Sequence, residues 1–240
     1  MVTAGAAALA ALLLTLPASA HQQRLLLGRS VEGRRIDAVE LGDRHAGKRL
    51  LVVGCIHGNE CAGLAIVRAL ERLPTPAGVD LWVIENLNPD GYAAASRQNA
   101  HGIDLNRNFP WAWRPLSGIY DSGPRPLSEP ESRIAYHLIL RVRPRISIWF
   151  HQHERLVDES GGDIGVERRF AALVGLPLKR LPREPGSAVG WENHRLPGTT
   201  GFVVELPGGS LSAAAAAGYA RAVLALARAE KPRSLARGRA

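Results

Sequence analysis

Nearly continuous apolar runs recur along the chain and constrain its fold more than any other feature. LLVVGC (50–55), VDLWVIEN (79–86), RISIWFHQ (145–152) and FVVEL (202–206) are the clearest of them. Runs of this kind are typical of strands that are buried on both faces of a mostly parallel sheet. A further strand is expected over 34–42, where RRIDAVELG alternates between apolar and polar residues.

Helices are expected between these strands. Apolar residues recur at helical spacing over 60–73, and Ser128-Glu129-Pro130-Glu131 is interpreted as a capping box that starts a helix reaching about Val142. Further helices are expected over 165–174 and over the alanine-rich segment 210–230. Strands that alternate with helices predict an α/β fold, with a mixed, mainly parallel central sheet flanked by helices as an α/β/α sandwich.

The amino-terminal segment has the pattern of an export signal. Residues 3–20 are almost uninterruptedly apolar and end in Ala18-Ser19-Ala20, the small-x-small pattern of a signal-peptidase site. The run has no basic residue before it, and a buried amino-terminal helix is the alternative. We therefore expect a signal peptide over 1–20 and an exported protein that is located in the periplasm, or outside the cell or at the cell wall.

The rest of the chain is expected to form one domain. The 240 residues are 46% hydrophobic, enough for one sizeable core. We expect a single catalytic domain over 21–230, a basic tail over 231–240, no membrane span once the signal is removed, and a monomer.

The charge of the chain bears on its partners. The formal net charge is +8, which suits an anionic partner such as a cell-wall polymer. Neither the aromatic pattern of RNA-binding domains nor the ligand spacing of zinc fingers is present, so no nucleic-acid partner is expected.

Polar side chains follow several of the expected strands. His57 and Glu60 follow the first apolar run, His151 and His153 lie at the end of another, and Glu205 lies near the end of the last. In open α/β sheets, ligands bind beyond the carboxyl ends of the strands. Histidine and glutamate are zinc ligands, and a catalytic zinc site keeps one position open. This pattern predicts a metal centre with a separate carboxylate, although the His-x-x-Glu spacing alone is weak evidence.

The segment NLNPDGYAAASRQNAHGIDLNRNFP (86–110) resembles the most specific motif of the zinc carboxypeptidase family. Other family motifs match in the same order: GRSVEGRRI (28–36), GCIHGNE (54–60), SEPES (128–132), FHQHE (150–154) and GFVVELP (201–207). The resemblance covers nearly the whole chain after residue 20. It implies the family's α/β/α fold, one Zn²⁺ per chain and hydrolysis of a peptide substrate.

The resemblance also implies a role for seven residues. In the family pattern, the residues that match zinc ligands are His57, Glu60 and His151, and the residue that matches the proton carrier is Glu205. Arg97 matches the arginine that stabilises the oxyanion, a role that needs preorganised positive charge. Asn106 and Arg107 match the pair that binds the substrate carboxylate, for which a forked guanidinium is well shaped.

Each of these assignments has an alternative. His151 and His153 are two residues apart and would face the same side of an extended strand, so only the family pattern favours His151. Glu205 is also compatible with a buried carboxylate beside a basic residue. Arg97 and Arg107 are also compatible with arginines that brace a loop.

Cys55 and Cys61, the two cysteines of the chain, bracket the expected ligand pair. A thiolate-rich zinc site would be structural rather than hydrolytic. In an exported protein a disulfide between the two cysteines is as plausible as two buried thiols, and geometry decides between them.

The chain departs from the family pattern in one region. Many family members carry a mobile tyrosine about twenty residues before the catalytic glutamate, but 181–205 contains no tyrosine. The chain is also short, so it is more similar to the compact bacterial branch that includes murein peptide amidases. These enzymes cut the bond between D-glutamate and diaminopimelate in cell-wall peptides.

The leading hypothesis is an exported zinc-dependent amidase or metallopeptidase that cuts next to a residue with a free carboxylate, in murein-derived peptides. The alternatives are a general exported carboxypeptidase that releases carboxyl-terminal amino acids, and a non-catalytic peptide-binding relative. No selectivity residue can be assigned within 183–200. We expect Asp163, Glu184, Glu192 and His194 to lie in solvent.

Overall fold

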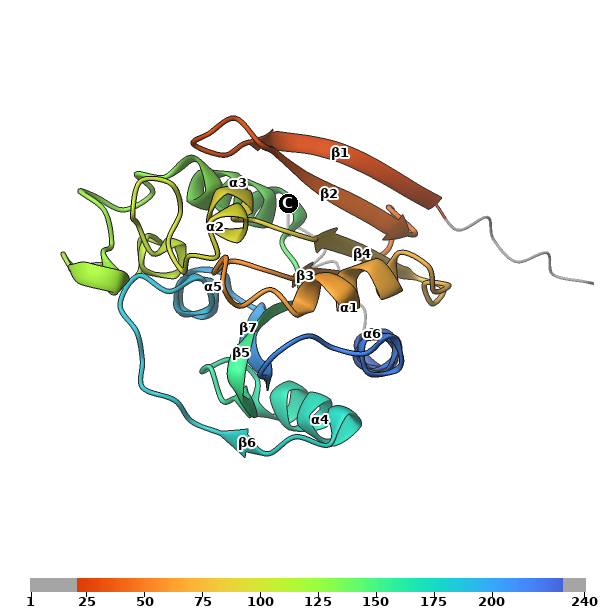
Figure 1. Ribbon diagram of the computed structural model, residues 1–240. Coiled ribbons are helices and arrows are strands. Elements are labelled where there is room, and N and C mark those ends of the chain that lie inside the picture. The colour runs from red at the N-terminus through yellow and green to blue at the C-terminus, as the bar shows by residue number, and fades with distance from the viewer. Residues whose placement is uncertain (1–20, 231–240) are drawn as a thin grey trace, which may run out of the picture.

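The computed structural model describes residues 21–230 (Figure 1). The expected signal peptide (1–20) and basic tail (231–240) lie outside the described residues. The seven strands are β1 (His21–Arg29), β2 (Arg35–Gly42), β3 (Lys48–Val53), β4 (Val79–Ile84), β5 (Ile146–Asp158), β6 (Leu178–Lys179) and β7 (Thr200–Pro207). The helices are α1 (Gly63–Leu70), α2 (Pro89–Ala93), α3 (Pro130–Val142), α4 (Ile164–Val174), α5 (Ala188–Arg195) and α6 (Ala213–Ala229), with the short 3₁₀ helices η1 (Leu105–Arg107) and η2 (Gly118–Tyr120).

The strands form one mixed sheet in the order β1-β2-β4-β3-β5-β6, with β7 also paired to β5. β1, β2 and β4 are antiparallel neighbours, whereas β4, β3, β5 and β7 run parallel. The carboxyl ends of β3, β5 and β7 therefore meet at one edge of the sheet, where ligands bind in open α/β folds.

Helices cover both faces of the sheet, as the α/β/α expectation required (Figure 1). α1, α4 and α6 pack on one face, and α3 and α5 on the other. Because side chains alternate along a strand, Leu50 and Val52 of β3 face the first layer while Leu51 and Val53 face the second. Burial on both faces is the physical reason for the unbroken apolar run at 50–53.

Strand β5 folds back on itself after its polar segment. His151 and Leu156 are both register partners of Glu205 on β7. The register shifts between these two positions, and Arg155 has a left-handed φ of 57°. The end of β5 at Asp158 therefore returns along β7 instead of running away from the sheet edge.

Several local expectations differ from the structure. The helix expected over 60–73 is α1, which begins only at Gly63, because Glu60 and Cys61 belong to the turn that follows β3. The capping-box interpretation is wrong: Glu129 is the N-cap of α3, no side chain caps the helix, and the Ser128 hydroxyl donates to Glu129. Strands β1 and β6 and helix α5 lie in segments where no element was expected.

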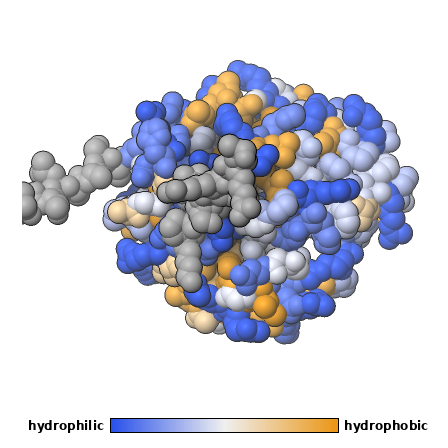
Figure 2. All heavy atoms as spheres, turned by 180° about the vertical axis from the view of Figure 1, so that it is seen from behind, coloured by the Kyte–Doolittle hydropathy of each residue, from blue (hydrophilic) through white to orange (hydrophobic). Residues whose placement is uncertain are grey.

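The exposed surface carries few large apolar side chains. The visible part of the face in Figure 2 is mostly hydrophilic, with hydrophobic residues in separate patches. Among residues 21–230, no helix combines the length and the apolar character that crossing a bilayer needs.

Candidate active site

The turn after β3 carries His57 and Glu60 to the edge of the sheet. His57 is 1% exposed, and the turn lies so close to α2 that a Cβ on Gly58 would be 1.9 Å from the carbonyl carbon of Gly91. Glycine is required here for space. Cys55 and Cys61 form a disulfide across this turn, with their Cα atoms 4.8 Å apart, within the usual range for such bridges. The bridge constrains the segment that presents His57.

Three side chains from two different segments converge beside this turn. The Nδ1 atoms of His57 and of His151, at the sheet edge on β5, each lie 3.1 Å from Oε2 of Glu60. The candidate ligand atoms of the three residues all lie within 4.8 Å of one another. Two imidazoles and one carboxylate are the donor set of several catalytic zinc sites. The residues present therefore fit a zinc ion.

Of the two histidines on β5, only His151 belongs to this cluster. His151 is 4% exposed, whereas His153 is exposed and lies opposite Pro207 in the register. Both side chains reach the wall of the same cavity. Only His151 reaches the cluster, although an extended strand would have placed both on one side.

Asp104 orients His57 from behind. Its Oδ1 lies 3.0 Å from Nε2 of His57, and the Asp104 side chain is fully buried. Burial alone would raise the pKa of Asp104, but the charge and hydrogen bond of His57, together with Arg97, hold that pKa well below its usual range. An ionised Asp104 that accepts a hydrogen bond from the Nε2–H group leaves Nδ1 of His57 free to bind a metal. From the sequence, Asp104 was expected only to shape its loop.

Replacing Asp104 with asparagine is expected to weaken zinc binding by about 10- to 100-fold, the usual effect of losing a carboxylate behind a ligand histidine. The dissociation constant for zinc, measured by competition with a chelator, tests this. Asp163→Asn is the matched control, because Asp163 caps α4 through the amide of Gly165, away from the cluster. Equal zinc affinities for Asp104→Asn and the control would show that Asp104 does not position His57.

Arg97 brings positive charge to the cluster. Its Nη1 donates to Oε1 of Glu60 at 2.9 Å, and its Nε donates to Oδ2 of Asp104 at 2.8 Å. The guanidinium also lies over the ring of Tyr120, with 5.2 Å to the ring centroid. Two charged hydrogen bonds fix the orientation of Arg97 at the cavity wall, so its positive charge is preorganised.

Asn106 and Arg107 lie in η1, which Asp104 caps through the amide of Asn106. Arg107 is 5% exposed, donates from Nη1 to the carbonyl of Asn106, and pairs through Nη2 with Glu184 at 3.2 Å. Its Nε has no hydrogen-bond partner among the described residues. A buried guanidinium with an unused donor at a cavity wall can bind a carboxylate.

The loop before α5 packs closely against η1 and the residues that follow it. Gly186 has φ +68°, and a Cβ there would lie 2.1 Å from the carbonyl oxygen of Arg107. The amide of Phe109 donates to Gly186, and the amide of Gly186 donates to Trp111. This close contact places Glu184 beside the guanidinium of Arg107.

The four charged or titratable residues expected in solvent behave differently from one another. Asp163, Glu184 and His194 are exposed; Glu184 pairs with Arg107, and His194 stacks on Trp111 with 4.1 Å between the ring centroids. Glu192 is fully buried, and its Oε1 accepts from Nε1 of Trp149 at 2.8 Å, so the solvated expectation is wrong for this residue. Its position on α5 faces the sheet, in a helix that was not expected from sequence.

Glu205 lies beside the group formed by His57, Glu60 and His151, called the metal-binding cluster below. It is the register partner of His151, and its Oε2 is buried without a hydrogen-bond partner among the described residues. Burial, with the negative charge of Glu60, raises the pKa of Glu205 to about 7. A carboxyl group with such a pKa and a free oxygen can both accept and release a proton near neutral pH.

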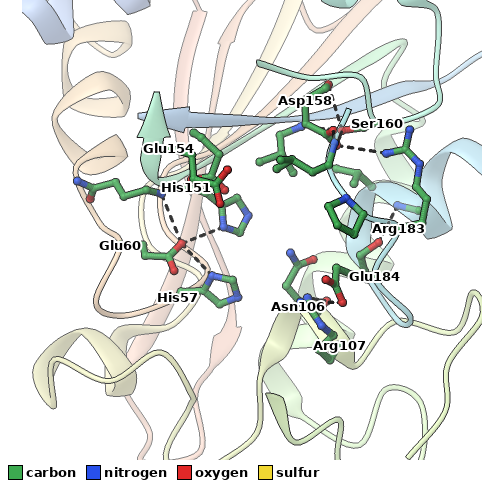
Figure 3. Close-up of a pocket in the computed structure, with 18 of the residues that line it drawn as sticks. His57, Glu60, Asn106, Arg107, His151, Glu154, Asp158, Ser160, Arg183 and Glu184 are labelled. Atoms are coloured by element: carbon green, nitrogen blue, oxygen red, sulfur yellow. Dashed lines mark hydrogen bonds and ion pairs between the residues drawn. The ribbon is translucent and has the colours of Figure 1, made fainter. Parts of the chain in front are cut away.

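One cavity of about 440 Å³ is lined by the seven residues that the family pattern singled out: His57, Glu60, Arg97, Asn106, Arg107, His151 and Glu205. Figure 3 shows His57, Glu60 and His151 at one side of it, Asn106 and Arg107 at its lower edge, and Asp158, Ser160 and Arg183 across from the cluster. Tyr120, Asp158, Ser160 and Arg183 also line the cavity. No local sequence pattern identifies them, because long-range contacts bring them there.

Comparison with known proteins gives concordant matches. The zinc carboxypeptidase family model matches residues 18–158. Murein peptide amidase A of Escherichia coli (strain K12) is 32% identical over 149 residues, covering 56% of this chain and 59% of that protein, less than two thirds of its length. The protein of the same name from Vibrio campbellii is 31% identical over 177 residues, covering 66% of this chain and 69% of that protein.

The fold is also found among solved structures. The crystal structure of murein-tripeptide amidase from Escherichia coli O157 superposes with a TM-score of 0.72 and 26% sequence identity. The superposition covers 87% of this chain and 92% of that one.

Proposed function

Because the chain belongs to the zinc carboxypeptidase family, we propose that it is a zinc-dependent hydrolase that cuts the amide bond between D-glutamate and diaminopimelate in murein-derived peptides. The observation that carries this proposal is the shared cavity. It combines a His-Glu-His cluster, an under-bonded glutamate and a buried arginine with an unused donor. The likeness to murein peptide amidases supports the choice of bond.

The cluster provides the metal chemistry. We assign His57, Glu60 and His151 as the ligands of one zinc ion, which when bound lowers the pKa of water and polarises the scissile carbonyl. Glu205 takes up the proton of the attacking water at its free Oε2 and returns it to the leaving nitrogen. Both transfers need a carboxyl group that changes protonation near neutral pH, and its raised pKa suits this role.

The two arginines bind the charged parts of the substrate. Arg97, fixed by Glu60 and Asp104, stabilises the negative charge that develops on the carbonyl oxygen. Arg107, with Asn106 beside it, binds the carboxylate next to the leaving nitrogen. That carboxylate enters where Glu184 already pairs with Arg107, so it shares or replaces this exposed partner.

The place of action is a second part of the proposal. We propose an exported monomer in the periplasm or cell wall, on the basis of the apolar segment that ends at Ala20. The disulfide between Cys55 and Cys61 supports this, because disulfides persist in oxidising compartments. Amino-terminal sequencing of the protein recovered from its own cells tests the expected start at His21.

Product analysis tests the reaction. We expect the zinc-loaded protein to release diaminopimelate from L-alanyl-γ-D-glutamyl-diaminopimelate, with much slower release of carboxyl-terminal residues from ordinary α-linked peptides. Mass spectrometry of both digests gives the answer. Comparable release from ordinary peptides would favour a general carboxypeptidase. No product from either, at one zinc per chain, would favour a peptide-binding protein without activity.

A further inference from the structure

The wall of the cavity opposite the metal-binding cluster carries a charged group that the reaction itself does not use. Because β5 folds back along β7, its last residue, Asp158, returns to the cavity, and Ser160 follows it. Arg183 comes from the loop before α5 and lies against them (Figure 3). These three residues are called the far-wall group below.

Asp158 is the buried member of this group. It is 5% exposed; its Oδ1 accepts from the amide of Leu181 at 2.8 Å, and its Oδ2 accepts from the Ser160 hydroxyl at 2.6 Å and from Nη1 of Arg183 at 3.3 Å. Arg183 also donates to the backbone carbonyl of Glu159. A buried carboxylate is costly unless it is paired. Among the described residues, its one ion-pair partner is Arg183, whose side chain is 44% exposed.

The cavity between the two sides is apolar in part. Val189 on α5 and Val203 on β7 line it, together with Leu181 and Pro182. A substrate whose carboxylate lies at Arg107 would direct its side chain across this apolar stretch. The side chain that fits has an aliphatic stem and ends at the far-wall group.

The charges of the far-wall group determine what such a side chain can end in. An ammonium group is attracted to the carboxylate of Asp158, and a carboxylate to the guanidinium of Arg183, whose planar fork suits that shape. The two groups lie side by side, because Asp158 and Arg183 are in contact. A terminus with both charges on one carbon therefore forms two ion pairs with them.

On the basis of the proposed function, we propose that Asp158 and Arg183 form a subsite for the side chain of the leaving residue. This subsite selects side chains that end in an ammonium and a carboxylate on one carbon. Side chains that end in an ammonium alone, or that carry no charge, bind less well. The residue next to the scissile bond is then recognised at two points, by Arg107 and by the far-wall group.

Three peptides that differ only in the leaving residue test the subsite. They carry γ-D-glutamyl linked to diaminopimelate, to lysine, which lacks the second carboxylate, or to norleucine, which lacks both charged groups. We expect kcat/KM of the zinc-loaded wild type to fall in that order, with each lost group costing about ten- to hundredfold, the range for a charged hydrogen bond.

Variants assign each preference to its residue. Arg183→Gln should remove the advantage of diaminopimelate over lysine, and Asp158→Asn should remove the advantage of lysine over norleucine. Arg180→Gln is the matched control, because Arg180 is a neighbouring arginine with a 66% exposed side chain that pairs with Glu159. Since Arg183 is half exposed, its replacement tests the proposal even where Asp158→Asn fails to fold.

Binding separates this proposal from the proposed function. Calorimetry of the three peptides with zinc-loaded Glu205→Gln protein reports selectivity without turnover. Selective binding of the diaminopimelate peptide by Glu205→Gln, together with no cleavage of any of the three peptides by the zinc-loaded wild type, would sustain the subsite and overturn the function. Cleavage of all three peptides with equal losses in Arg183→Gln would overturn the subsite and leave the function intact.

Discussion

Glu205→Gln is expected to lower kcat by about 10²–10⁴, the contribution of a positioned proton carrier, without loss of zinc. The amide keeps the shape of the side chain but cannot take up a proton. Because Oε2 of Glu205 is buried without a partner among the described residues, the replacement breaks no hydrogen bond at that atom. Steady-state kinetics on the diaminopimelate tripeptide, with zinc content by inductively coupled plasma mass spectrometry, measure both quantities.

Glu192→Gln is a demanding control for this variant. Glu192 is also a buried glutamate, and burial raises its pKa to about 7, as for Glu205. It accepts a hydrogen bond from Trp149 and does not line the cavity wall. We expect the turnover of Glu192→Gln to stay within a few-fold of that of the wild type. Near-normal turnover in Glu205→Gln would instead mean that Glu205 is a structural carboxylate.

His151→Ala is expected to abolish stoichiometric zinc binding and to lower turnover by more than 100-fold. Changes behind a ligand typically cost 10- to 100-fold, so loss of a ligand itself should cost more. Dialysis followed by metal analysis, with a melting curve to establish folding, measures the effect.

His153→Ala is the matched control for the ligand assignment. His153 lies two residues along β5, is exposed, and takes no part in the His57–Glu60–His151 cluster. It should retain close to one zinc per chain. A protein that loses its zinc in His153→Ala but keeps it in His151→Ala would reverse the assignment.

Hydrophobic patterning made much of the fold predictable. β3, β4, β5 and β7 lie within two residues of the starts expected from their apolar runs, because each strand is covered on both faces and needs apolar residues throughout. α4 and α6 also follow the expected segments. One face of each helix packs on the sheet. β1 was not predicted, because most of its side chains are exposed and the sequence of such an edge strand lacks a clear apolar pattern.

The order of strands and motifs also determined which residues meet. His57, Glu60, His151 and Glu205 follow or end strands that run parallel, so they gather at one edge of the sheet. Their residue types then indicated zinc chemistry, and the family motifs indicated hydrolysis. This part of the site depends only on chain order and strand direction, which the sequence encodes locally.

Only the tertiary structure decided the remaining details. The period of an extended strand leaves His151 and His153 equivalent, but in the structure His151 is buried in the cluster and His153 is exposed. Asp104 contacts His57 across 47 residues of chain, and Asp158 pairs with Arg183 across 25. The pattern of apolar and polar residues predicts which face of a helix or strand is buried. It does not predict which distant loop packs against that face. For this reason the metal-binding cluster was predictable, whereas the residues that orient it and line the far wall of the cavity were not.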